Sequence, residues 1–194
     1  MTSLRVGMGL TSAESTLEAA PAAARLALEH GGFEKAGAAV CALIPGAEDN
    51  PGDVVRQLAS ILGTEVLLVL CVEQLMDGTR EVREEGSACV FALEGAQARL
   101  SAVADLVGEE IGLGPALLAD LGGSRGTQEH KAESLVLLGF DCLRLSPALL
   151  QKGLSEYSQS HCVVGLGVSP VGPENCAIWA GLEPIHAGAA ALVL

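Results

Sequence analysis

The side chains best placed for chemistry lie at the ends of two apolar runs that have the length of β-strands. They are Cys71, Val72, Glu73, Gly165, Leu166, Gly167 and Ser169. Ligands of open α/β sheets bind where strands end, because the loops there diverge and leave a crevice. Glu73 could hold an ammonium group, and the glycines would let a ligand approach the backbone closely. We therefore predict a ligand-binding site at these seven residues. The simpler alternatives are glycines that only allow close packing and a solvated Glu73.

A thiol nucleophile is a second chemical possibility. Cys71 could be activated by a histidine that is distant in the sequence, although no serine or cysteine stands in a GxSxG elbow. The six cysteines form no CxxC pair, and no histidine lies three to five residues from another histidine or a cysteine. We expect the cysteines to be reduced thiols, and we expect no metal.

Gly165-Leu166-Gly167 resembles only the first part of a dinucleotide-binding motif. Pro170 and Pro173 follow it, where that motif needs a third glycine and the start of a helix. We therefore expect no nucleotide cofactor.

Two predicted helices, each between two apolar runs of strand length, would position the seven residues of the predicted site. Asn50-Pro51 and Ser146-Pro147 are typical helix starts, and they predict helices over Asn50–Leu62 and Ser146–Tyr157. Each helix lies between two apolar runs of strand length. These runs are Ala38–Ile44, Val66–Cys71, Leu135–Phe140 and Cys162–Gly167. An apolar strand, a helix and a second apolar strand are typical of a parallel βαβ unit whose sheet is covered on both faces.

The two units repeat at a fixed distance. Pro51 and Pro147 are 96 residues apart, and the same shift relates the flanking runs, which predicts similar halves at about 1–95 and 97–194. We expect an α/β fold of two βαβα-plus-strand halves, with sheets inside and helices outside, arranged either as α-β-β-α layers or as one mixed sheet. The remaining predicted helices are Ser15–His30 and Leu106–Leu121, and the remaining strands are Leu4–Gly9, Ala88–Leu93, Ala98–Val103, Cys176–Ala180 and Ala189–Leu194. We interpret 46–50, 73–86, 122–131 and 168–174 as loops.

Composition limits the class of protein. The 194 residues include 11 Lys+Arg and 24 Asp+Glu, for a net charge of −13, and 49% are hydrophobic. This composition excludes a disordered chain, and the acidity argues against nucleic-acid binding. No apolar run approaches the ~18 residues of a membrane span, and no secretory signal is visible, so we expect a cytoplasmic protein without membrane contact.

The order of these motifs resembles the N-terminal domain of the FIST (F-box and intracellular signal transduction) family. The resemblance rests on Gly7–Ser12, Val66–Cys71, Ser134–Cys142, Leu149–Leu154 followed by Cys162–Gly167, and Gly188–Leu194. It implies a sensory domain of intracellular signalling that binds small ligands such as amino acids. At the turn after Leu70, this chain keeps the family's cysteine (Cys71) and lacks its flanking glycine and Ser/Thr.

We therefore expect a module that binds a small metabolite. The alternatives are a small enzyme that uses the Cys71 thiol and a scaffold subunit that a partner chain completes. Besides the ligand, we expect a signalling protein or a second copy of the chain as partner. The apolar run Ala189–Leu194, placed at a sheet edge, would form the contact in a homodimer.

Overall fold

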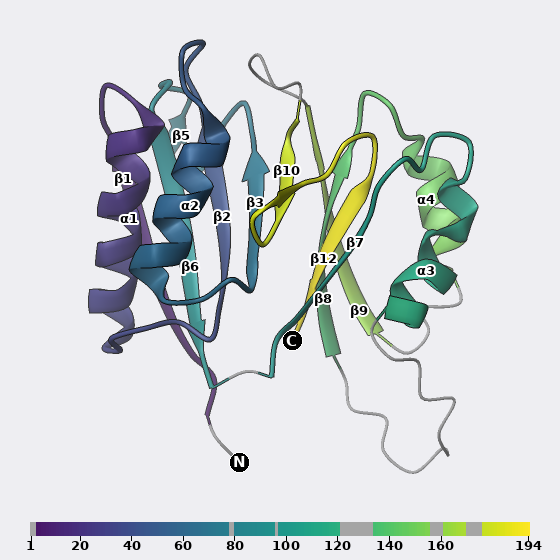
Figure 1. Ribbon diagram of the computed structural model, residues 1–194, viewed down its shortest axis with the longest axis horizontal. Helices are drawn as coiled ribbons and strands as arrows, with labels where there is room; N and C mark the ends of the chain where they lie inside the picture. The colour runs from purple at the N-terminus through teal and green to yellow at the C-terminus, as the bar shows by residue number, and fades with distance from the viewer. Residues whose placement is uncertain (1–2, 78–79, 96, 121–133, 156–160, 170–175) are drawn as a thin grey trace.

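The computed structural model has the α/β fold predicted from the sequence, in four layers. Two sheets lie between a pair of helices on one side and a second pair on the other (Figure 1). The structure describes residues 3–77, 80–95, 97–120, 134–155, 161–169 and 176–194. Among these residues, no helix combines the length and the apolar character that crossing a membrane requires.

Each half of the chain presents its elements in the same order. The first half contains β1 (Arg5–Ser12), α1 (Thr16–Gly31), β2 (Ala38–Ile44), α2 (Pro51–Leu62), β3 (Leu67–Cys71), β4 (Leu75–Asp77), β5 (Arg80–Val82) and β6 (Ser87–Glu94). The second contains β7 (Arg99–Val103), the short 3-10 helix η1 (Glu110–Gly112), α3 (Leu113–Asp120), β8 (Ser134–Asp141), α4 (Pro147–Gly153), β9 (His161–Val168), β10 (Ile178–Ala180), β11 (Glu183–Pro184) and β12 (Ala189–Val193).

The two main sheets also share one strand order. The first half forms β1-β6-β2-β3 and the second forms β7-β12-β8-β9. In each, the last strand pairs antiparallel with the first and second strands, and the second and third strands are parallel. The halves differ in the hairpin that follows their third strand. β10–β11 extends the first half's sheet beyond β3, whereas β4–β5 forms a separate two-stranded sheet.

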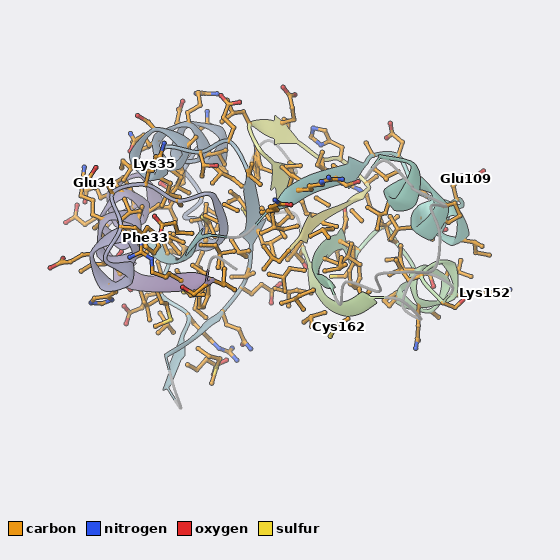
Figure 2. The ribbon with its side chains drawn as sticks, turned by 90° about the horizontal axis from the view of Figure 1, so that it is seen from below. Phe33, Glu34, Lys35, Glu109, Lys152 and Cys162 are labelled. Carbon is orange, nitrogen blue, oxygen red and sulfur yellow. The ribbon has the colours of Figure 1, made fainter. Side chains whose placement is uncertain are left out.

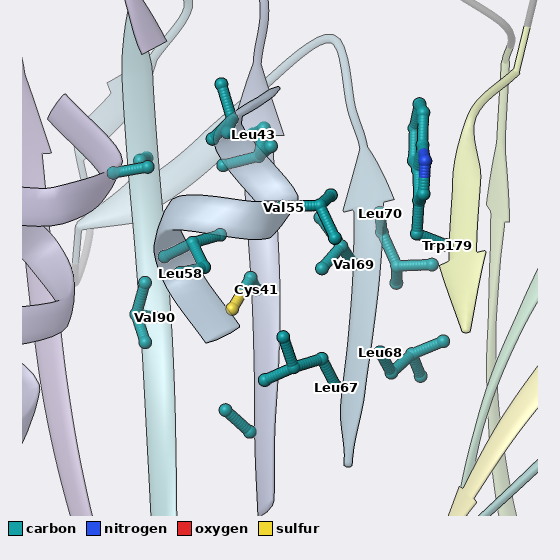
Figure 3. Packing of buried hydrophobic residues seen from close by; sticks show 14 of the residues in the cluster. Cys41, Leu43, Val55, Leu58, Leu67, Leu68, Val69, Leu70, Val90 and Trp179 are labelled. Carbon is teal, nitrogen blue, oxygen red and sulfur yellow. The ribbon is translucent and has the colours of Figure 1, made fainter. Parts of the chain in front are cut away.

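Helix α2 covers the first sheet for reasons visible in its sequence. The Asn50 side chain accepts a hydrogen bond from the Gly52 N–H at 3.0 Å, and Gly63 ends the helix with a φ of 67°. The buried side chains of the helix, which include Val55 and Leu58, lie over β2 and β3 (Figure 3).

Helix α1 lies very close to the strand β1, because the facing surfaces of both elements are made of small residues. A Cβ added to Gly7 or Gly9 of β1 would collide with the backbone carbonyl oxygens of Ala27 and Ala23. The glycines of the Gly7–Ser12 motif therefore allow the helix backbone to lie directly on the strand.

The two sheets meet through β3 and β10 of one and β12 and β8 of the other. A Cβ at Gly139 of β8 would overlap the Leu70 side chain of β3, so glycine makes room for the opposing sheet. Trp179 of β10 is 1% exposed and stands beside Val69 and Leu70 (Figure 3). Ala190 and Leu192 of β12 belong to the same buried cluster.

Four expectations need correction. The predicted helix Leu106–Leu121 begins only at Leu113, after the 3-10 helix Glu110–Gly112, and Leu121 lies outside the described residues. The segment 73–86 contains the hairpin β4–β5, because its three-residue strands are too short to show an apolar pattern. Helix α4 ends at Gly153, before the predicted end at Tyr157, which lies outside the described residues. Ala189–Leu194 is no sheet edge, since β12 pairs with β7 on one side and β8 on the other. A homodimer cannot form by strand pairing at that position.

Candidate functional site

The first predicted segment follows the end of β3. Cys71 is completely buried, and its N–H donates to the Ala177 carbonyl at 2.8 Å. Val72 is half-buried, and its N–H donates to the Leu43 carbonyl at 2.8 Å. Glu73 is exposed, and it adds to the effect of Glu81, whose hydrogen bond and charge are the main cause of the raised pKa of Arg83. Of these three residues, only Glu73 presents a functional group to solvent.

The environment of Cys71 opposes thiol chemistry. Burial raises the pKa of the thiol to about 12, with a further contribution from the neighbouring Cys176. Because the thiolate is the nucleophile, a buried thiol with a raised pKa is inert at neutral pH. The geometry therefore does not favour the enzyme alternative at Cys71.

The second predicted segment belongs to β9, the outer strand of its sheet. Gly165, Leu166 and Gly167 are exposed, and Ser169 lies 3.7 Å from the Cys142 thiol. A Cβ at Gly167 would come within 2.9 Å of the Cys142 Cβ, so this glycine has a packing role. A Cβ at Gly165 would meet only Phe140 and Leu138, at 3.8 and 3.9 Å.

The two segments lie at the same end of the molecule without forming one site. β3 and β8 point the same way in Figure 1, and β9 runs parallel to β8. However, β10 occupies the free edge of β3, and no hydrogen bond between described residues joins 71–73 to 165–169, although Cys71 and Val168 belong to the same buried cluster.

A cleft lies one strand away from Cys71, where β2 ends. Its volume is about 540 Å³, within the usual range of ~300–1,000 Å³ for small-molecule sites. It is lined by Glu14, Ser15, Leu17, Gly46, Ala47, Glu48, Asp49, Asn50, Asp53 and Glu85. None of the seven predicted residues lines it, but Leu43 of β2 pairs with Cys71 of β3, so the cleft and Glu73 follow neighbouring strands.

Backbone hydrogen bonds hold together the three segments that form the cleft. The Ala13 N–H donates to the Gly86 carbonyl at 3.0 Å, and the Gly86 N–H donates to the Ile44 carbonyl at 2.8 Å. Gly86 adopts a φ of 76°, which favours glycine at this crossing point. The starts of α1 and α2 and the segment before β6 are thereby brought to one place.

Asp49 is the structural centre of the cleft. Its Oδ2 accepts hydrogen bonds from the Thr16 N–H at 3.0 Å, the Thr16 hydroxyl at 2.7 Å and the Gly46 N–H at 2.9 Å. Burial disfavours the charged form, but the hydrogen bonds from Thr16 and Gly46 outweigh it and lower the pKa of the carboxyl. Asp49 is therefore ionised at neutral pH and caps the start of α1.

The cleft carries an excess of negative charge. Five of its lining residues are carboxylates. Of these five, only Asp53 forms an ion pair among the described residues, with Arg56. Helix N-termini favour nearby anions, and Asp49 and Asp53 occupy those positions at α1 and α2. Glu14, Glu48 and Glu85 are exposed and remain for a ligand. The arrangement suits a small molecule that carries a primary amine.

The second half also contains buried carboxyl groups. Glu110 Oε1 accepts from the Ser146 N–H at 3.3 Å, while its Oε2 has no hydrogen-bond partner among the described residues, and Asp141 pairs with Arg144 at 3.0 Å. Within the described part of the chain, no group of three His, Cys, Asp or Glu side chains is arranged to hold a metal ion.

The sequence alone does not predict the cleft, because the charged pair Glu48-Asp49 in the loop 46–50 has the character of a solvated loop. One available indication was the position of these acids between a buried strand and the helix start Asn50-Pro51. The contributions of Glu14 and Glu85 come from segments distant in the sequence and required the fold.

Comparisons with known proteins give no family for the chain. No family model and no curated protein matches it. Among solved structures, it is similar to a cyanuric acid hydrolase from A. caulinodans, with 11% identity and a TM-score of 0.45. That match covers 100% of this chain and 71% of the hydrolase. A likeness this distant carries no argument about function.

Proposed function

We propose that this protein binds a small amine-bearing metabolite, of the amino-acid type, in the acidic cleft where β2 ends. The observation that carries the proposal is the set of exposed carboxylates, Glu14, Glu48 and Glu85, around a cleft of ligand size. The proposed cleft lies one strand away from Cys71, Val72 and Glu73, and the proposed ligand is of the kind expected from the sequence.

The position of the cleft supports binding. It lies at the carboxyl end of a parallel strand, where open α/β sheets bind their ligands. Asp49 fixes the backbone of two lining segments, so the ligand would meet a largely preformed surface. The resemblance to FIST domains supports the same ligand class and a sensory role.

A thermal-shift measurement tests the proposal. The probes are free amino acids, small diamines and, as a matched series without the amine, the corresponding carboxylic acids. A ligand present at 100 times its dissociation constant adds about 2.7 kcal/mol to the free energy of unfolding, which gives a shift of several degrees. We expect shifts with amines and none with the acids.

A pair of charge-matched variants locates the site. Glu48→Gln/Glu85→Gln removes two cleft carboxylates, whereas Glu29→Gln/Glu34→Gln removes two carboxylates from the opposite end of α1. The first variant should lose the amine-induced shift and the second should keep it. Equal responses would refute binding in the cleft, and no shift with any amine would refute the ligand class.

A further inference from the structure

The hairpin β10–β11 closes an edge that the first half leaves open. β10 pairs antiparallel with β3, with Ile178 opposite Leu70, Trp179 opposite Val69 and Ala180 opposite Leu68. The Gly181 N–H donates to the Leu67 carbonyl at 2.8 Å. The second half therefore supplies a strand to the sheet of the first.

The first half has an equivalent hairpin, β4–β5, which does not pair with the edge strand of a larger sheet. Asp77 lies opposite Arg80 in β4–β5, as Ala180 lies opposite Glu183 in β10–β11, and a glycine follows each first strand in the sequence. This alignment makes Leu75 equivalent to Ile178 and Met76 equivalent to Trp179. Among the described strands, β4 pairs only with β5, and Met76 is 60% exposed where Trp179 is 1% exposed.

The second half has the corresponding open edge. β9 is the equivalent of β3 in its sheet, and its only described partner is β8. Val164 is 54% exposed and Leu166 is 47% exposed. A long edge strand with exposed apolar side chains is a ready acceptor for another strand.

We propose that the hairpin β4–β5 of one chain adds to β9 of a second copy, and that the exchange is reciprocal. The internal equivalence sets the register: Leu75 opposite Leu166, Met76 opposite Gly165, and Asp77 opposite Val164. This pairing is β-strand addition, the same contact that the two halves make within one chain.

A second copy is the occupant that the chain itself specifies. Among the described strands, β1, β7, β9 and β11 are the edges of the two larger sheets, and β9 is the one equivalent to the edge of β3 that β10 covers. The hairpin β4–β5 and β9 lie on the same side of the molecule, which is the lower side in Figure 2, where Cys162 marks β9. The parallel strands of the two halves, β2 with β3 and β8 with β9, run in one direction (Figure 1). A reciprocal exchange of this kind would relate the two copies by a two-fold axis, as in most homodimers.

Side chains around the proposed contact fit this arrangement. A Cβ at Gly165 would be in ordinary contact with Phe140 and Leu138, at 3.8 and 3.9 Å, so the missing side chain leaves room beside them for Met76 of a partner strand. The inner faces of both sheets also continue beyond the region where the sheets meet. Their uncovered apolar residues are Val6, Met8, Phe91, Leu135, Val164 and Leu166, each 37–54% exposed. Together with Met76 they form an exposed apolar surface of the kind that marks a protein–protein contact.

The mass in solution tests the proposal. At micromolar concentration and about 0.15 M salt, where exposed charges are screened beyond ~8 Å, light scattering should give twice 19.7 kDa. Met76→Glu and Val164→Glu should give one chain mass, and Met76→Leu should stay dimeric. Leu143→Glu is the matched control, because Leu143 is 70% exposed and lies outside the proposed surface. A monomeric wild type, or equal behaviour of Met76→Glu and Leu143→Glu, would overturn the proposal. Circular dichroism establishes that each variant is folded.

A cross-link tests the register independently of mass. In a Cys162→Ser background, Met76→Cys/Gly165→Cys should form a disulfide between chains on oxidation, since opposed strand positions have the required Cα spacing of ~4.4–6.8 Å. A covalent species of two chains should appear on a non-reducing gel and disappear with reductant, while each single variant gives none. A disulfide within one chain, or no disulfide, overturns the exchange of hairpins. The test of amine binding in the cleft near Asp49 is independent of these experiments, because no residue that lines the cleft belongs to the proposed dimer contact.

Discussion

At the scale of single residues, Asp49 has the most specific role, because one carboxylate oxygen connects α1 to the segment after β2. Asp49→Asn keeps the shape and weakens the acceptor, so we expect a loss of about 1–2 kcal/mol in the free energy of unfolding at pH 7. Thr16→Val, which removes only the hydroxyl donor, should lower the free energy of unfolding by less than Asp49→Asn does. Urea denaturation of the wild type and the two variants measures these differences.

The same residue predicts a pH dependence. The folded pKa of Asp49 lies below its usual value of 3.8, so its stabilisation is complete above that value and is lost as pH falls through the folded pKa. The stability difference between wild type and Asp49→Asn should therefore shrink between about pH 5 and pH 2. A difference that stays constant over this range would contradict the assigned hydrogen bonds.

At the scale of elements, the contact of α1 with β1 depends on the missing side chains of two glycines. Gly9→Ala would force the helix backbone away from the strand, and overpacking of this kind costs about 1–3 kcal/mol. Gly112→Ala is the control, since no atom lies within 4 Å of the added Cβ and the backbone is not left-handed. Thermal unfolding should show a lower Tm for the first variant only. Equal Tm values would mean that α1 is not seated on β1 as described.

Elements with a strong local pattern were predictable from the sequence, and elements defined by tertiary contact were not. Ala38–Ile44 is predicted and observed with identical bounds, because a buried parallel strand is continuously apolar. The helix Asn50–Leu62 is recognisable from its cap and apolar face. The hairpin β4–β5 has neither feature. The position of β12 between β7 and β8 depends on pairings distant in the sequence, and so does the collection of carboxylates around Asp49.

At the scale of the whole molecule, the strand β10 joins the two halves by pairing with β3, so we expect them to unfold as one cooperative unit. Trp179, the single tryptophan, lies in this strand and is buried where the sheets meet. We expect denaturation followed by Trp179 fluorescence to coincide with denaturation followed by far-UV circular dichroism. Leu70→Ala, which opens a cavity at the same contact, should shift both curves equally, by about 2–5 kcal/mol. Two separated transitions would show that each half is stable alone.

The central position of each half's last strand has a consequence during synthesis. β6 lies between β1 and β2, and β12 lies between β7 and β8. Neither sheet can close before its final strand has left the ribosome, although translation at ~5–20 residues per second exposes the earlier strands for seconds. The edge of β3 stays unpaired for longer, because its partner β10 emerges about 110 residues later in the sequence. The nascent chain therefore presents apolar strand edges throughout most of its synthesis, and such edges are prone to aggregation until their partner strands emerge.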